Sequence, residues 1–314
     1  MRVQSGVMMG PTDASQAVGV SPGGERRIIQ DLLAGASLEL SSRDPAEIDA
    51  CVGLLEPGTA VYISMPPGQT YHGNVALAAR LRRAGFNPVP HIAARRIASH
   101  DALDEYLERA VGEAAVDSAL VIAGDNDRAS GPFEDSLALL ETGTFQRHGI
   151  VHVGVAGYPE GHPRIAPSAL DSALAAKKSL ARRAGLDLRV VTQFSFESDP
   201  VLAWVAKIKG HGIPVRVGLS GPASLPRLLK FAALCGVGNS VRALKARPQA
   251  ITRLLVEAGP EVVVRDLARH SAPPMAGLHF FCFGGVVRTA RWLRALREGR
   301  FELTEDGGFR VGSA

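Results

Sequence analysis

The sequence has few cysteines and no long apolar run, and both absences narrow the possible classes of protein. Cys51, Cys235 and Cys282 are the only cysteines in 314 residues, and no two are spaced as CxxC. This argues against a disulfide framework or a zinc site. Such sparse usage is typical of the reducing cytoplasm, where we expect the protein to work. No stretch of about 18 apolar residues occurs, so we expect no membrane span.

The chain also lacks a large excess of charge of either sign. The chain carries 35 basic and 31 acidic residues, a formal net charge of +4. This small excess does not predict nucleic-acid binding, and a mildly basic protein is better suited to a small anionic ligand. Residues 1–22 contain no apolar core flanked by positive charge, so we interpret them as a flexible tail rather than a signal peptide. Residues 23–314 are then expected to form a single domain.

Several catalytic and nucleotide-binding motifs are missing. No GxGxxG follows the first predicted strand and no P-loop occurs, which argues against an open, doubly wound nucleotide-binding sheet. No GxSxG and no HExxH is present, so neither a nucleophile elbow nor a helical zinc-protease site is expected.

Short apolar runs alternate with amphipathic runs along most of the chain. Several are apolar throughout, such as 118–124, as expected for strands buried on both faces of a parallel sheet. The predicted strands are Ser37–Leu40, Ala60–Met65, Pro88–Ala93, Ala119–Ala123, His152–Ala156, Leu188–Phe194, Val215–Leu219 and Leu278–Phe283. The predicted helices are Gly24–Leu33, Asp44–Leu55, Asn74–Ala84, Asp101–Glu113, Glu134–Thr142, Ser168–Ala184, Asp199–His211, Ser224–Leu234, Gln249–Arg269 and Val286–Glu298. This alternation predicts an α/β fold, a (β/α)8 TIM barrel, with a short hairpin over 301–311.

Polar residues gather where the predicted strands end, which is where a TIM barrel carries its active site. They are Glu39, His91, Asp125, Tyr158, Glu160, His162 and Gln193. Gly124, before Asp125, lets the backbone approach a ligand closely, and the Tyr158 ring can stack on a planar one. His279 and Cys282 belong to the last strand and are assigned to the barrel interior or wall, because they lack metal-ligand spacing.

These segments resemble, in chain order, motifs of the methylenetetrahydrofolate reductase family. The matching segments are Ser37–Glu39, Pro90–Ile92, Ala123–Asp125, Gly154–Pro163, Thr192–Phe196 and His279–Phe281. The resemblance implies a (β/α)8 barrel that holds FAD. It also implies hydride transfer that interconverts 5,10-methylenetetrahydrofolate and 5-methyltetrahydrofolate. The implied barrel agrees with the independent strand count.

The resemblance also implies roles for individual residues. Glu39 would bind the folate and act as its general acid, and Asp125 would tune the flavin and hold the substrate. Gln193 and Phe194 would contact the folate. The residues implied to contact FAD are His91, Gly124, Asp125, Ala156, Tyr158, His162, Asp171 and Lys178. No protein-bound metal is implied. Glu39 can act as an acid near neutral pH only if its pocket raises its pKa.

The sequence departs from the family pattern near the substrate. Leu40–Arg43 replaces the family's aromatic and proline-rich segment, Ala123 replaces an arginine, and the loop 219–225 lacks an aromatic residue that some members have. We expect NADH as the electron donor, with a flavodoxin-like or ferredoxin-like reductant as the alternative. Oxidation of methyltetrahydrofolate is the alternative direction.

Two other functions compete with this interpretation. One is a metal-dependent barrel lyase or hydrolase that uses His91, Asp125 and His162. The other is a catalytically silent barrel that binds folate or flavin. Under the main interpretation the partner is a small-molecule folate, the protein forms a homo-oligomer, and neither nucleic acid nor membrane is bound.

Overall fold

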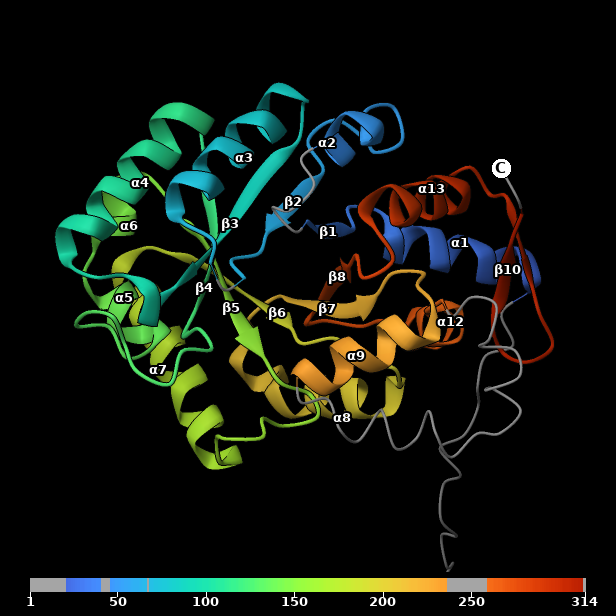
Figure 1. The fold of residues 1–314 in the computed structure, drawn as a ribbon. Helices are drawn as coiled ribbons and strands as arrows, with labels where there is room; N and C mark the ends of the chain where they lie inside the picture. Colours follow the sequence, from blue (N-terminus) through green and yellow to red (C-terminus); the bar gives the residue numbers. More distant parts are fainter. Residues whose placement is uncertain (1–20, 41–45, 67, 236–258, 313–314) are drawn as a thin grey trace, which may run out of the picture.

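Eight parallel strands close into a barrel in the computed structural model, which describes residues 21–40, 46–66, 68–235 and 259–312 (Figure 1). The strands are β1 (Ser37–Leu40), β2 (Ala60–Ile63), β3 (Asn87–Ala93), β4 (Ser118–Ile122), β5 (His152–Gly157), β6 (Asp187–Thr192), β7 (Val215–Ser220) and β8 (Met275–Phe281). Closure comes from the pairing of β8 with β1, in which Glu39 lies opposite Phe281. The predicted TIM barrel is confirmed, with all eight strands where the alternation put them.

Helices are arranged around the barrel and follow the strands (Figure 1). They are α1 (Pro22–Leu33), α2 (Ala46–Cys51), α3 (Tyr71–Arg83), α4 (His100–Ala114), α5 (Ser136–Glu141), α6 (Thr144–Arg147), α7 (Pro167–Ala184), α8 (Ser198–Ile208), α9 (Leu225–Cys235), α12 (Glu261–Arg269) and α13 (Val286–Arg297). Two short 3₁₀ turns cover Ala94–Arg96 and Lys209–His211. No helix of the described ranges combines the length and the apolarity that crossing a membrane requires.

Helix boundaries differ from prediction where local backbone decides them. The segment expected to be one helix at 134–142 is followed by a separate turn of helix, α6, because Gly143 adopts a left-handed conformation with φ of 69°. Ser21 caps α1 and Pro22 begins it, so the last two residues of the predicted tail belong to this helix. The rest of the tail, the predicted start of α2 at 44–45, and 249–258 of the predicted long helix lie outside the described residues.

The surroundings of β4 explain why its sequence is apolar throughout. Ala119 and Val121 are buried in the large core between the barrel and its helices. Leu120 and Ile122 point the other way and pack with Tyr62 inside the barrel. A strand in this position has two buried faces, so period-two alternation of polar and apolar residues is lost.

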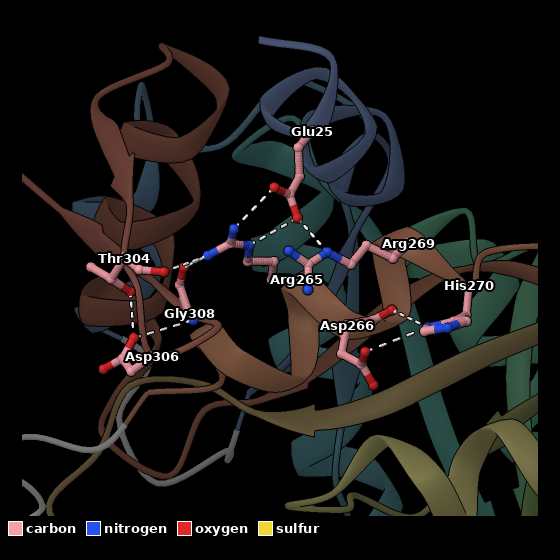
Figure 2. Close-up of polar contacts among 8 residues, drawn as sticks. All are labelled: Glu25, Arg265, Asp266, Arg269, His270, Thr304, Asp306 and Gly308. Carbon is pink, nitrogen blue, oxygen red and sulfur yellow. Dashed lines mark hydrogen bonds and ion pairs between the residues drawn. The ribbon is translucent and has the colours of Figure 1, made fainter. Parts of the chain in front are cut away.

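A buried ion-pair network joins the first helix to the last hairpin (Figure 2). Two nitrogens of Arg265 on α12, Nε and Nη2, donate to the carboxylate of Glu25 on α1 at 2.9 and 3.0 Å. Arg269 also donates to Glu25. The remaining guanidinium nitrogen of Arg265, Nη1, donates to the carbonyls of Thr304 and Gly308 at 2.7 and 2.6 Å. These carbonyls flank the turn of the predicted hairpin, which is confirmed as the antiparallel strands β9 (Phe301–Leu303) and β10 (Phe309–Val311).

Candidate active site

The fold brings the predicted site residues to one end of the barrel. Glu39 and His91 lie near the carboxyl ends of β1 and β3, whereas Asp125, Tyr158 and Gln193 follow β4, β5 and β6. Because all eight strands are parallel and the barrel is closed, these five positions surround a single mouth. A cluster of polar side chains at this mouth, rather than on the opposite face, is what a barrel enzyme requires.

Glu39 forms the centre of a buried cluster. Its neighbours Leu38 and Leu40 pack outward into the core, so the alternation of β1 turns Glu39 inward. Its Oε2 lies 3.5 Å from Nε2 of His91 and 3.7 Å from Nε2 of His279. Neither Nε2 atom has a hydrogen-bond partner among the residues that the structure describes. Both imidazoles therefore face the same carboxylate without a well-formed hydrogen bond.

His279 is held in this orientation by two contacts. Ser37 Oγ lies 3.0 Å from its Nδ1, and the ring of Tyr62 meets it edge-on with centroids 4.6 Å apart. His279 is fully buried, which confirms its assignment to the barrel interior. Its contact with Glu39 was not predicted, since the two residues are far apart in the chain and meet only through the pairing of β8 with β1.

The electrostatics of the cluster differ from what a lone acid requires. Burial raises the pKa of Glu39, but the neighbouring imidazoles of His91 and His279 outweigh it, and the net direction of the pKa is down. The condition for Glu39 to act as a lone acid, a raised pKa, is therefore not met in this geometry. Burial lowers the pKa of His91, Glu39 opposes this, and His279 adds to it. Glu39 is thus an anion between two imidazoles, and any proton belongs to the cluster as a whole.

Asp125 has a partner that the sequence analysis missed. Its carboxylate is 66% exposed and accepts from Arg96 Nη2 at 3.0 Å. Arg96 follows β3, and its side chain is fixed by the carbonyls of Met65 and Pro66 at 2.7 and 2.8 Å. A guanidinium from a neighbouring strand end thus stands beside Asp125 although Ala123 occupies the family's arginine position. The pair Arg95-Arg96 directly after a predicted strand was the available signal.

Gly124, immediately before Asp125, has a backbone conformation that lets the turn after β4 approach the end of β3 closely. Its φ is 92°, a conformation that favours glycine, and a Cβ atom there would lie 3.2 Å from the Cβ of Ala93. The turn after β4 therefore packs against the end of β3, which positions the exposed carboxylate of Asp125 at the mouth.

The turn after β5 combines an aromatic ring, an imidazole and an acid. The partly buried Tyr158 ring meets His162 edge-on at 5.0 Å. Burial lowers the pKa of His162, and the charge of Arg164 lowers it further, so this imidazole is neutral near pH 7. Glu160 accepts from Ser195 Oγ at 2.8 Å, which ties this turn to the segment after β6.

The neighbouring strands β5 and β6 carry the remaining mouth residues. Ala156 on β5 lies opposite Val191 on β6. The backbone N–H of Gln193 donates to the Gly157 carbonyl at 2.8 Å and continues this pairing past the strand end. The amide oxygen of Gln193 accepts from the backbone N–H of Phe194 at 3.1 Å, which holds the side chain near the mouth.

The two predicted phosphate-helix residues lie on α7. Asp171 is committed to an ion pair with Lys207 of α8, whose Nζ lies 2.7 and 2.9 Å from its two carboxylate oxygens. Lys178 is partly buried, and burial lowers the pKa of its neighbour Lys177. Asp171 is therefore already paired, and Lys178 is the cationic side chain of the two predicted residues.

An aromatic cluster borders the Glu39 site. Phe194 is only 1% exposed and meets Phe283 edge-on at 4.9 Å. Phe283 stacks on Phe231 of α9 at 4.2 Å, and Phe281 meets His279 at 4.9 Å. This wall comes from separate strands and a helix, so its assembly could not be read from spacing. Phe194 lies behind it, and a ligand would contact Phe281 or Phe283 first.

The metal alternative finds no geometric support. Within the described ranges, no three His, Cys, Asp or Glu side chains are grouped so that they could hold a metal ion. The three residues proposed for it have separate environments: His91 faces Glu39, His162 contacts Tyr158, and Asp125 pairs with Arg96.

Comparison with known proteins identifies the family. The family model described as methylenetetrahydrofolate reductase matches residues 68–284, more than half of the chain, so the protein belongs to this family. Family and barrel together make it a folate-related enzyme of the methylenetetrahydrofolate reductase type.

Solved structures show weaker similarity. Dihydropteroate synthase (FolP) from Thermus thermophilus is 16% identical with a TM-score of 0.44, over 84% of this chain and 92% of that one. 3-Dehydroquinate dehydratase from Geobacillus kaustophilus is 11% identical with a TM-score of 0.44, over 84% and 90% of the two chains. Similarity at this level specifies no function.

Proposed function

We propose that this protein is an FAD-dependent oxidoreductase that interconverts 5,10-methylenetetrahydrofolate and 5-methyltetrahydrofolate. The observation that supports it best is the shared mouth of Glu39, Asp125 and Gln193 in a chain of this family. We further propose a single domain over residues 23–314, NADH as the donor and a homo-oligomeric assembly.

The side chains at the mouth are chemically suited to a flavin and a pterin. Asp125 offers an exposed carboxylate to a heterocyclic N–H, and Arg96 keeps it oriented. The Tyr158 ring can pack on a planar ring system, and Lys178 can pair with a phosphate as a point charge. Under this proposal FAD is contacted by His91, Gly124, Asp125, Ala156, Tyr158, His162, Asp171 and Lys178. The folate is contacted by Glu39 and Gln193, with Phe194 supporting the wall beside it.

The bound FAD would supply the hydride chemistry, and the protein would supply orientation and the proton. Opening the five-membered ring of methylenetetrahydrofolate requires one proton on the departing nitrogen. We assign this proton to the Glu39–His91–His279 cluster rather than to Glu39 alone, because both imidazoles lower the pKa of that carboxyl. A cluster that shares one proton can deliver it in reduction and take it back in oxidation.

Spectroscopy of the purified protein tests the cofactor, and anaerobic mixing with NADH tests the donor. We expect flavin absorbance that bleaches with NADH and returns with methylenetetrahydrofolate. Absorbance that stays oxidised with NADH but bleaches with a reduced flavodoxin or ferredoxin would replace the donor and keep the reaction. A colourless protein that binds no added FAD would refute the proposal.

The variant Glu39→Gln tests the proton role. It should keep FAD but lose turnover by about 10²- to 10⁴-fold, the usual contribution of a positioned acid–base group. Glu302→Gln is the matched control, because Glu302 is exposed on the hairpin strand β9. Wild-type turnover in Glu39→Gln would contradict the assignment. FAD binding without turnover in the wild-type protein, with any donor, would favour the silent binding barrel.

A further inference from the structure

A cavity opens at the opposite end of the barrel from the candidate active site. Its volume is about 490 Å³. Its lining includes first residues of the strands, such as Ala60, Asn87 and Ser118, together with the turn after α1 and part of α13. This volume lies within the range of sites for small organic molecules. None of the residues predicted to act on flavin or folate lines it.

Two arginines from adjacent strands point into this cavity. Arg189 on β6 and Arg216 on β7 both line it, while their strand neighbours Val190, Val215 and Val217 are fully buried on the outer side. Arg189 pairs with Asp187 at 2.9 Å. Arg216 donates to the Gly35 carbonyl at 2.7 Å and has no ion pair within the described part of the chain.

The other charged groups at this end are already paired. Arg297 of α13 lies 3.0 Å from Glu56. Asp187, the partner of Arg189, also accepts from His152 at 2.8 Å. Among the described residues, the charge of Arg216 is therefore left without a carboxylate. Burial lowers the pKa of Arg216, Tyr62 opposes this, and the neighbouring charge of Arg189 lowers it further, so the guanidinium is held at a cost that a bound anion would relieve.

Tyr62 forms the inner wall of the cavity. Its side chain lines the cavity although the residue is only 2% exposed, and its hydroxyl has no hydrogen bond among the described residues. The other side of its ring meets His279 at 4.6 Å and His91 at 6.1 Å. Tyr62 thus separates the cavity from the Glu39 cluster and contacts both.

We propose that this cavity binds a small organic anion, with its oxyanion group on Arg216 and Arg189 and its apolar part against Tyr62 and Val89. Guanidinium groups bind carboxylates and phosphates through paired N–H donors, which fits either oxyanion. The cavity is much larger than an inorganic ion, and Val89 and the ring of Tyr62 give it apolar surface, so an organic group belongs to the ligand.

Calorimetry on the full chain, as purified, tests this site with inorganic phosphate, phenyl phosphate and benzoate at millimolar concentration. We expect saturable one-to-one binding of at least one aromatic anion, tighter than inorganic phosphate. A preference for phenyl phosphate identifies a phosphate ester as the ligand class, and a preference for benzoate identifies a carboxylate. No saturable binding of either aromatic anion overturns the proposal.

Variants locate the binding. Arg216→Met should weaken it by at least about tenfold, since it removes a charge-assisted contact. Arg189→Met is a second test should Arg216→Met fail to fold. Ala60→Leu keeps both arginines but fills part of the cavity. It should therefore weaken the binding of phenyl phosphate more than the binding of inorganic phosphate. Arg109→Gln on α4 is the matched control. Unchanged binding in folded Arg216→Met and Arg189→Met places the anion elsewhere and overturns the proposal. The outcome is independent of the proposed flavin chemistry.

Discussion

Removing Arg265 should destabilise the protein strongly, although this residue is far from the candidate active site. Arg265 and Glu25 have side chains that are each 9% exposed, and two N–H groups of the arginine bond the carboxylate (Figure 2). Breaking a buried pair by removing one partner costs about 3–5 kcal/mol. Glu25 still has Arg269 as a partner, which favours the lower end of this range, about 3 kcal/mol. The carbonyls of Thr304 and Gly308 also lose their hydrogen-bond donor, which costs about 1 kcal/mol for each carbonyl.

We therefore expect Arg265→Met to lower the free energy of unfolding by about 5 kcal/mol, measured by urea unfolding followed by circular dichroism. The double variant Glu25→Leu/Arg265→Met should lose less, because no buried carboxylate is left short of its partner. Arg109→Gln is the control: its pair with Glu113 is exposed and is worth about 0.5 kcal/mol or less. A loss near 1 kcal/mol or below for Arg265→Met, or a double variant less stable than the single, would refute the reasoning.

The same pair predicts a dependence on pH. The hydrogen bond from Arg265 lowers the pKa of Glu25, burial opposes it, and Arg269 lowers the pKa further. The stabilisation is therefore complete above the unfolded-state pKa of about 4.3 and is lost as the pH falls through the lower folded-state pKa. The stability difference between wild type and Glu25→Gln should shrink over that acid range. A difference that does not change there would contradict the ion-pair account.

Three further predictions concern the mouth of the barrel. Replacing His279 by Asn should raise the pKa of Glu39 and move the acid limb of the pH–rate profile to higher pH; an unmoved profile would argue against a shared proton. Arg96→Ala should release Asp125 and raise KM for folate more than about fivefold at similar thermal stability, whereas unchanged kinetics would mean that Asp125 orients itself. Gly124→Ala should cost about 1–3 kcal/mol in urea unfolding, because its φ of 92° is strained for alanine, and a neutral effect would argue against that backbone.

The sequence determined the architecture because its signals are local. A strand such as β4 is buried on both faces whatever its neighbours are, so its apolar run alone predicts it. The positions of Glu39, Asp125 and Tyr158 relative to strand ends are equally local, and the barrel rule converts them into one mouth. Family motifs in the same segments added the folate assignment, which the family match bears out.

What the tertiary structure decided depends on contacts between distant segments. Closure of β8 on β1 brings His279 to Glu39, and His91 and His279 together set the direction of the carboxyl pKa opposite to the one expected for an isolated buried acid. Arg96 reaches Asp125 from another strand end. Arg216 has no carboxylate partner among the described residues at the far mouth, because Asp187 and Glu56 are already engaged. Periodicity specifies which way a side chain points, but a charge's partners, and hence its chemistry, exist only once the barrel is closed.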